Sequence, residues 1–159
     1  MVHVGSSPMT RTYMNEIQIP IASIGARVRS ALEAAKEAAK NSSAPCFRHG
    51  AVLFSGAAHY GIGYNDYRAV AWAWKSDRTI PPELISGLRQ NNMHAEIACM
   101  HNVPRELITN SDIMVVRIDK TGTLCLSKPC SNCQRNMREK KIRRCYYSID
   151  ERTIGRFDV

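Results

Sequence analysis

The sequence predicts a single α/β domain in which helices and strands form layers around a central sheet. Two observations favour this class: segments with a helical apolar period alternate with short apolar runs of strand length, and the alternation continues along the chain. The 159 residues are enough to bury a core and correspond to one domain. We expect residues 1–12 to be a loose N-terminus, because they are small, polar and without period, and residues 13–159 to form the domain.

The first elements are predicted to be a helix and a hairpin. Pro20 suits the first turn of the helix, apolar residues then recur every 3.6 residues, and the polar run 40–43 ends it. The apolar runs 50–54 and 59–65 lie on either side of the turn signal Ser55-Gly56, which is typical of a hairpin.

Residues 66–92 are predicted to be a long connection with a short helix near 82–89. Connections of this length are usually lids or disordered insertions, and a lid is favoured because this one leads directly to His94. Its Trp72 and Trp74 lie among cations, so they either stack on bases of a single strand or pack the lid onto the core.

The second half is predicted to contain two helices and two strands. They are a helix at 94–101 that continues or restarts after Pro104, a strand at 112–118, a helix at 129–140 and a strand at 143–149. The tail at 151–159 is not assigned. Both helices then begin at segments that carry metal-binding residue types, and a helix N-terminus favours thiolates and a polarised carbonyl.

Those two segments are His94-Ala95-Glu96 and Pro129-Cys130-Ser131-Asn132-Cys133. Two cysteines three residues apart on a helical turn place their sulfurs on one face, close enough to share a tetrahedral zinc ion, and His94 supplies a nitrogen ligand. Three protein ligands leave the fourth position to water, which is the mark of a catalytic zinc site. The combined pattern is the signature of zinc nucleobase deaminases.

Glu96 is the candidate catalytic residue. Zinc lowers the pKa of bound water to about 7, and one carboxylate can take a proton from that water and pass it to the base, as general base and then general acid. The alternative is an ordinary helix glutamate beside a structural zinc, which requires a fourth protein ligand. Cys99, His101 or Cys125 could in principle provide it.

The chain is basic, with a net charge of +8 and a pI near 9.4. Much of the excess lies in the segment 135–144, where six cations are opposed within the segment only by Glu139. Such a segment either attracts phosphates and nucleic acid or is a solvated helix face. The substrate is expected to be anionic.

No apolar run is long enough for a membrane span, and no secretory signal is recognised, so the expected compartment is the cytoplasm. Cysteines there are kept reduced. Two of the six bind metal in this interpretation, and the other four, which lie in or beside apolar runs, are expected to be buried small hydrophobes: Cys46, Cys99, Cys125 and Cys145.

From about Arg48 to Ser148 the chain resembles the cytidine and deoxycytidylate deaminase superfamily, on the two motifs and the run Ile142-Arg143-Arg144-Cys145-Tyr146-Tyr147-Ser148. The resemblance implies a three-layer fold with a mixed five-stranded sheet flanked by helices, and one zinc ion per subunit. It assigns Zn²⁺ binding to His94, Cys130 and Cys133, and proton transfer to Glu96. It also implies a homo-oligomer.

The resemblance further implies three substrate contacts. The backbone N–H of Ala95 would meet the pyrimidine carbonyl, the backbone carbonyl of Lys128 would accept from the exocyclic amine, and Asn65 would contact the sugar. For Asn65 the alternative is a turn asparagine that ends a hairpin. Lys128 departs from the small or acidic residue common at its position, and its cation is a candidate phosphate contact. His49 either lines the pocket or is a satisfied histidine at a strand start.

These residues predict zinc-dependent hydrolytic deamination of cytosine in a free nucleotide or nucleoside such as deoxycytidine monophosphate. The small size and the absence of an appended nucleic-acid domain favour this substrate class. The alternative is cytosine within single-stranded DNA or RNA, which the charge and the tryptophans favour. Adenosine in transfer RNA is disfavoured by the closer likeness to the cytosine side, and a non-catalytic zinc module is disfavoured by the intact Glu96.

Overall fold

The computed structural model describes residues 15–66 and 93–159, and a mixed sheet runs through its centre. The sheet has the order β1-β7-β6-β4-β2-β3, with β5 paired to the end of β4. Its strands are β1 (Ile17–Pro20), β2 (Arg48–Ser55), β3 (Ala58–Tyr64), β4 (Asp112–Ile118), β5 (Leu124–Cys125), β6 (Arg144–Ser148) and β7 (Thr153–Asp158). The predicted mixed α/β fold is confirmed, but the sheet has seven strands where five were expected.

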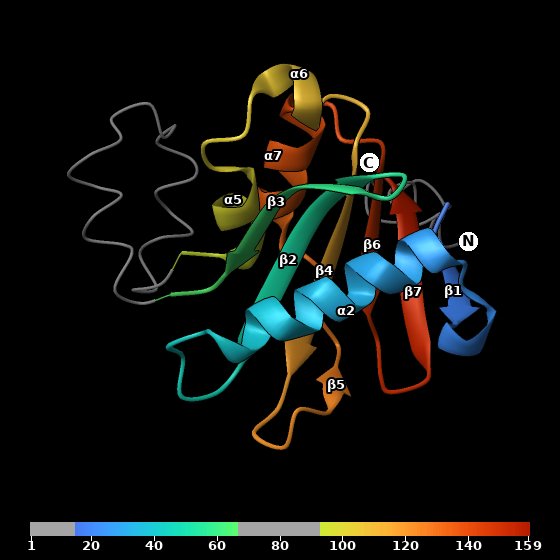
Figure 1. Ribbon diagram of the computed structural model, residues 1–159, viewed down its shortest axis with the longest axis vertical. Coiled ribbons are helices and arrows are strands. Elements are labelled where there is room, and N and C mark those ends of the chain that lie inside the picture. Colours follow the sequence, from blue (N-terminus) through green and yellow to red (C-terminus); the bar gives the residue numbers. More distant parts are fainter. Residues whose placement is uncertain (1–14, 67–92) are drawn as a thin grey trace, which may run out of the picture.

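Helices cover both faces of this sheet, which gives the predicted three layers (Figure 1). The helical elements are the 3₁₀ turn η2 (Ile21–Ser23), α2 (Ala26–Lys40), α5 (Ala95–Met100), α6 (Arg105–Ile108) and α7 (Ser131–Glu139). The long helix α2 lies across one face, and α5 and α7 lie on the other. None of the helices within the described ranges is long and apolar enough to cross a membrane.

Neither the two strands at one edge of the sheet nor the short strand β5 was predicted from the sequence. β7 occupies the unassigned tail, pairs antiparallel with β6 and buries Ile154 and Phe157. β1 pairs antiparallel with β7, and Pro20 is its last residue, opposite Thr153. The expectation that Pro20 opens the helix was therefore wrong, since α2 begins only at Ala26. Proline is tolerated there because it ends an edge strand.

The remaining elements follow the prediction closely. β2 and β3 form the expected hairpin, with a register irregularity between Leu53 and Phe54. The predicted helix at 94–101 ends at Met100 and restarts after Pro104, because Asn102 adopts a left-handed conformation with φ of 64°. β4 and β6 are the parallel pair that makes the sheet mixed, and a helix, α7, connects them, as parallel neighbours require.

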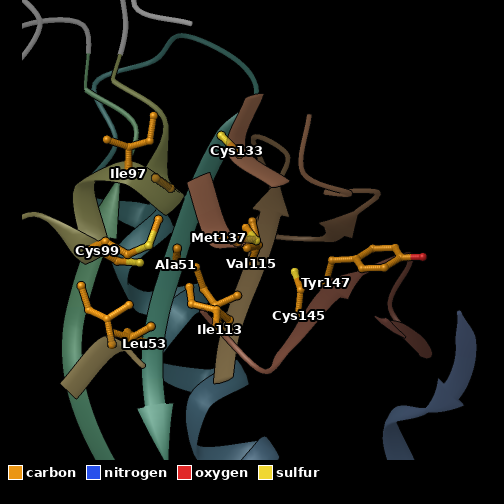
Figure 2. Packing of buried hydrophobic residues seen from close by; sticks show 14 of the residues in the cluster. Ala51, Leu53, Ile97, Cys99, Ile113, Val115, Cys133, Met137, Cys145 and Tyr147 are labelled. Atoms are coloured by element: carbon orange, nitrogen blue, oxygen red, sulfur yellow. The ribbon is translucent and has the colours of Figure 1, made fainter. Parts of the chain in front are cut away.

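The sheet separates two apolar cores. One contains the residues between α2 and the sheet, among them Leu32, Val52 and Met114. The other lies between the sheet and helices α5, α6 and α7 and includes Cys133. Figure 2 shows Met137 of α7 beside Val115 of β4 in this core. Strand residues two apart share a face, so Ala51 and Leu53 of β2 belong to this second core.

Gly63 sets how closely β3 approaches α5. A Cβ atom at this position would lie 2.7 Å from the Ala98 carbonyl carbon and 2.8 Å from the Ala95 oxygen, both backbone atoms of α5. We expect Gly63→Ala to destabilise the protein by about 1–3 kcal/mol, as overpacking does, and to displace the helix that begins after His94. Chemical denaturation measures this cost. Gly25→Ala is the matched control, since nothing lies within 4 Å of its Cβ position; an equal loss there would contradict the packing argument.

Candidate metal and catalytic site

The N-termini of α5 and α7 bring together the two sequence motifs. His94 is the residue that precedes α5, and Cys130 is the residue that precedes α7, so both predicted helix starts are confirmed. Cys133 lies in the first turn of α7 and is fully buried, whereas Cys130 is exposed. Gln134 fixes the approach to α7, because its Nε2 donates a hydrogen bond to the Pro129 carbonyl at 2.8 Å.

His94, Cys130 and Cys133 form the one candidate metal-binding group found among the described residues, with their ligand atoms within 4.8 Å of one another. His94 Nδ1 lies 3.3 Å from the Cys133 sulfur and 3.8 Å from the Cys130 sulfur. A tetrahedral zinc ion with bonds of about 2.0–2.1 Å to nitrogen and 2.3 Å to sulfur separates such atoms by about 3.6 Å. The three residues therefore fit zinc, with Nδ1 as the histidine ligand atom.

Hydrogen bonds within this group concentrate negative charge on Cys130. Donation from Cys133, assisted by His94, lowers the pKa of the Cys130 thiol to about 3, while desolvation of the sulfur opposes the shift. The pKa of Cys133 is raised, first by that hydrogen bond and then by burial. The hydrogen bond to Cys130 raises the pKa of His94. A sulfur that is already deprotonated is the form that binds zinc.

Glu96 lies in the first turn of α5 and is only 5% exposed. Its negative charge acts on Cys133 and also on His94, whose pKa it raises, so the carboxylate lies near the metal ligands. In the described part of the chain this carboxylate has no hydrogen bond or ion pair. A buried carboxylate costs free energy unless it is paired.

A pair of serines that the sequence analysis missed holds the segment before Cys130 against the sheet. Ser127 Oγ donates to the Val115 carbonyl at 2.8 Å and accepts from the Ser148 backbone N–H at 2.9 Å. Ser148 Oγ donates to the Cys125 carbonyl at 2.6 Å. Both serines are at most 3% exposed.

Asn65 fastens the loop that precedes β2. Its Oδ1 accepts from the His49 backbone N–H at 2.8 Å and from Ser42 Oγ at 2.6 Å, while its Nδ2 donates to the Phe47 carbonyl at 2.9 Å. The side chain is buried. Asn65 therefore follows the end of the hairpin and holds the loop before β2 in position. The sugar contact predicted for Asn65 stays a prediction.

His49 lies on the same side of the sheet as the metal ligands. Its Nδ1 donates to the Phe47 carbonyl at 2.8 Å, which identifies the tautomer, since a carbonyl only accepts. Burial lowers the pKa of His49, and the charge of Glu96 opposes that shift. The imidazole thus lies within electrostatic range of the Glu96 carboxylate and also has a hydrogen-bond partner at the start of β2, so a pocket-lining role for His49 stays a prediction.

The two backbone contacts predicted for the substrate lie beside the metal ligands. Ala95 is fully buried in the first turn of α5. Lys128 precedes Pro129, and its ammonium forms an ion pair with Glu16 at 2.9 Å, near the rings of Tyr147 and Phe157. The cation of Lys128 is therefore held by a carboxylate and by aromatic rings.

The positive charge of the segment 135–144 is partly neutralised by carboxylates from other strands. Arg143 forms a two-pronged ion pair with Asp112, at 2.7 and 3.0 Å, which raises the pKa of the guanidinium. Arg144 lies 3.6 Å from Asp158. Carboxylates from other strands thus oppose two of the six cations.

The expectation for the cysteines was partly wrong. Cys99 and Cys145 are buried, as predicted, but Cys46 is exposed and Cys125 is half-buried. Cys46 lies in the loop before β2, where Pro45 and Phe47 are also exposed, so its apolar neighbours do not enter the core. The structure does not describe residues 67–92, so the lid predicted at 66–92, its short helix and the roles of Trp72 and Trp74 lie outside the described residues. Asp66 is described and pairs with Met93.

An α/β sandwich with a His-Cys-Cys metal group and a buried glutamate beside it defines a zinc-dependent hydrolytic enzyme. Comparison with protein families matches residues 26–149 to the cytidine and deoxycytidylate deaminase zinc-binding region. The chain belongs to this family, since the match spans most of its 159 residues. A search of curated proteins returned no match.

Proposed function

We propose that this deaminase converts cytosine to uracil in a free nucleotide or nucleoside, such as deoxycytidine monophosphate. The observation that carries the proposal is the buried Glu96 carboxylate beside His94, Cys130 and Cys133, which has no hydrogen bond or ion pair among residues 15–66 and 93–159. Hydrolytic loss of the C4 amine needs a nucleophilic water and two proton transfers, and the family supplies this chemistry with one zinc ion.

In this reaction Glu96 carries the protons. Zinc held by His94, Cys130 and Cys133 supplies the lowered water pKa that hydrolysis at neutral pH requires. The Glu96 carboxylate takes a proton from water as the water oxygen bonds to C4, and delivers that proton to N3 of the cytosine ring. Glu96 then moves the proton of the new C4 hydroxyl to the C4 amine, so that the C4–N bond breaks, ammonia leaves and a carbonyl forms at C4. Burial of Glu96 strengthens each of these interactions, because bulk water does not screen them.

Three residues are proposed to orient the substrate. The Ala95 N–H donates to the pyrimidine carbonyl, the Lys128 carbonyl accepts from the exocyclic amine, and Asn65 contacts the sugar. What supports Asn65 is its position: its carbonyl oxygen and amide group already fix Phe47 and His49, so the loop and the sugar would be held by one side chain.

Cytosine within single-stranded DNA or RNA is the second candidate substrate. The net charge of +8 favours it, because phosphate contacts dominate affinity for nucleic acid. The ion pairs of Arg143 and Arg144 weaken this argument, since they reduce the positive charge that the segment 135–144 presents. The free substrate is therefore preferred.

The deciding experiment is turnover by zinc-loaded protein of deoxycytidine monophosphate, deoxycytidine and a cytosine-containing single-stranded oligonucleotide, each measured by ammonia release. We expect the free substrates to be converted and the oligonucleotide to be inert. Glu96→Ala serves as the blank for contaminating deaminases. Conversion of the oligonucleotide alone would replace the proposal with the second candidate, and no conversion of any cytosine substrate would reject both.

A further inference from the structure

A small cavity lies where the loop before β2 meets the end of β4. It has a volume of about 150 Å³ and is lined by Cys46, Phe47, Arg48, Arg117, Ile118, Asp119 and Lys120. At roughly 30 Å³ per water molecule, a cavity of this volume has room for a compact group of a few heavy atoms. None of these residues belongs to the site described above.

The cavity lies at the end of the sheet, where Arg48 and Ile118 line it from the face of α2 and Arg117 lines it from the face of the metal ligands. Arg117 pairs with His49 across β2 and β4, and the next pair on that face is Ala51 with Val115, which packs with Ala95 and Cys133. Two residues along a strand correspond to about 7 Å. Arg117 therefore lies one such step beyond the core that supports the site, and His49 lies within electrostatic range of both Arg117 and Glu96.

Phe47 forms the platform on which the Arg117 guanidinium rests. The centre of the guanidinium is 4.9 Å from the ring centroid, a cation–π contact. Phe47 has φ of 56°, a left-handed conformation that is strained for an aromatic residue. Asn65 and His49 both donate to its carbonyl and hold it there. The strain thus accompanies a fixed orientation of the ring beneath Arg117.

The cavity has an excess of positive charge. Three cations line it, Arg48, Arg117 and Lys120, against the single carboxylate of Asp119. That carboxylate accepts hydrogen bonds within its own turn, from Thr121 and Thr123, and these lower the pKa of Asp119. Arg48 donates to the Asp119 carbonyl at 2.8 Å. In the described part of the chain no carboxylate pairs with Arg117.

We propose that this cavity binds the phosphate monoester of a cytosine nucleotide, with the Arg117 guanidinium as the main ligand. This inference rests on the proposed function and names its substrate class as nucleotide rather than nucleoside. A guanidinium presents paired N–H donors that match two phosphate oxygens, and its contact with Phe47 fixes their direction. The ammonium of Lys128 does not fill this role, because it is paired with Glu16.

The first test compares Arg117→Gln with wild type on deoxycytidine monophosphate and deoxycytidine. Loss of a charge-assisted hydrogen bond should lower kcat/KM for the monophosphate by about 10- to 100-fold, mainly through KM. We expect the value for deoxycytidine to stay within twofold and Arg117→Lys to restore part of the loss. Arg138→Gln, an exposed arginine of α7, is the matched control and should resemble wild type.

The second test does not depend on turnover. Inorganic phosphate should raise the melting temperature of zinc-loaded wild type and of Arg138→Gln, but not of Arg117→Gln. Equal losses on both substrates, or equal phosphate stabilisation of Arg117→Gln and wild type, would overturn the inference. A preference for an oligonucleotide that depends on Arg117 would also overturn it, since the bound group would then be a phosphodiester. If no cytosine compound is converted, the proposed function fails and the phosphate measurement still decides the cavity.

Discussion

Replacing Glu96 with glutamine is expected to lower kcat for cytosine deamination by about 10²- to 10⁴-fold, the usual contribution of general acid–base catalysis. Glutamine keeps the shape and hydrogen-bonding capacity of the side chain but cannot accept and return a proton. KM should change little, because Glu96 acts on protons and not on substrate affinity. Steady-state kinetics with the preferred cytosine substrate measure the effect.

The fold and the metal should survive Glu96→Gln. Glu96 is 5% exposed and has no partner in the described part of the chain, so removing its charge relieves a buried, unpaired carboxylate. We therefore expect an unchanged or slightly higher melting temperature and one zinc ion per chain. The matched control is Glu106→Gln, at an exposed position of α6, which should retain full activity. Activity of Glu96→Gln within tenfold of wild type would remove Glu96 from the mechanism.

The metal group was predictable because local spacing determines half of it. Cys130 and Cys133 are brought together by one helical turn, so only the approach of His94, at the N-terminus of a second helix, depended on the tertiary fold. The hairpin β2–β3 and strand β4 were predictable for the same reason: their apolar runs and turn residues are local signals.

The features that were missed depend on partners distant in sequence. β1 and β7 are short strands that are stable only because they pair with each other and with β6. Ser127 meets Ser148, and Asn65 meets Phe47, through contacts that no sequence period indicates. The charge of the segment 135–144 was read along the chain, whereas its neutralising carboxylates come from neighbouring strands.

Replacing Cys133 with serine is expected to abolish zinc retention and activity together. Cys133 is fully buried, with its sulfur 3.3 Å from His94 Nδ1, and serine is a far weaker ligand for zinc than a thiolate. Zinc content measured after gel filtration should fall from one ion per chain to near zero, and deamination should fall to the level of the Glu96→Ala blank.

The same substitution should lower stability, because zinc binds the folded chain and not the unfolded one. At a free zinc concentration 1,000 times Kd, this linkage contributes about 4 kcal/mol, which corresponds to roughly 8–16 °C in melting temperature for a domain of this size. A chelator should therefore lower the melting temperature of wild type but not of Cys133→Ser. Cys145→Ser is the matched control, since Cys145 is equally buried and is not part of the metal group. Cys145→Ser also introduces a buried hydroxyl, so it can lower stability through packing alone. If it does so while keeping zinc, the loss of zinc in Cys133→Ser is due to the missing ligand and not to poorer packing.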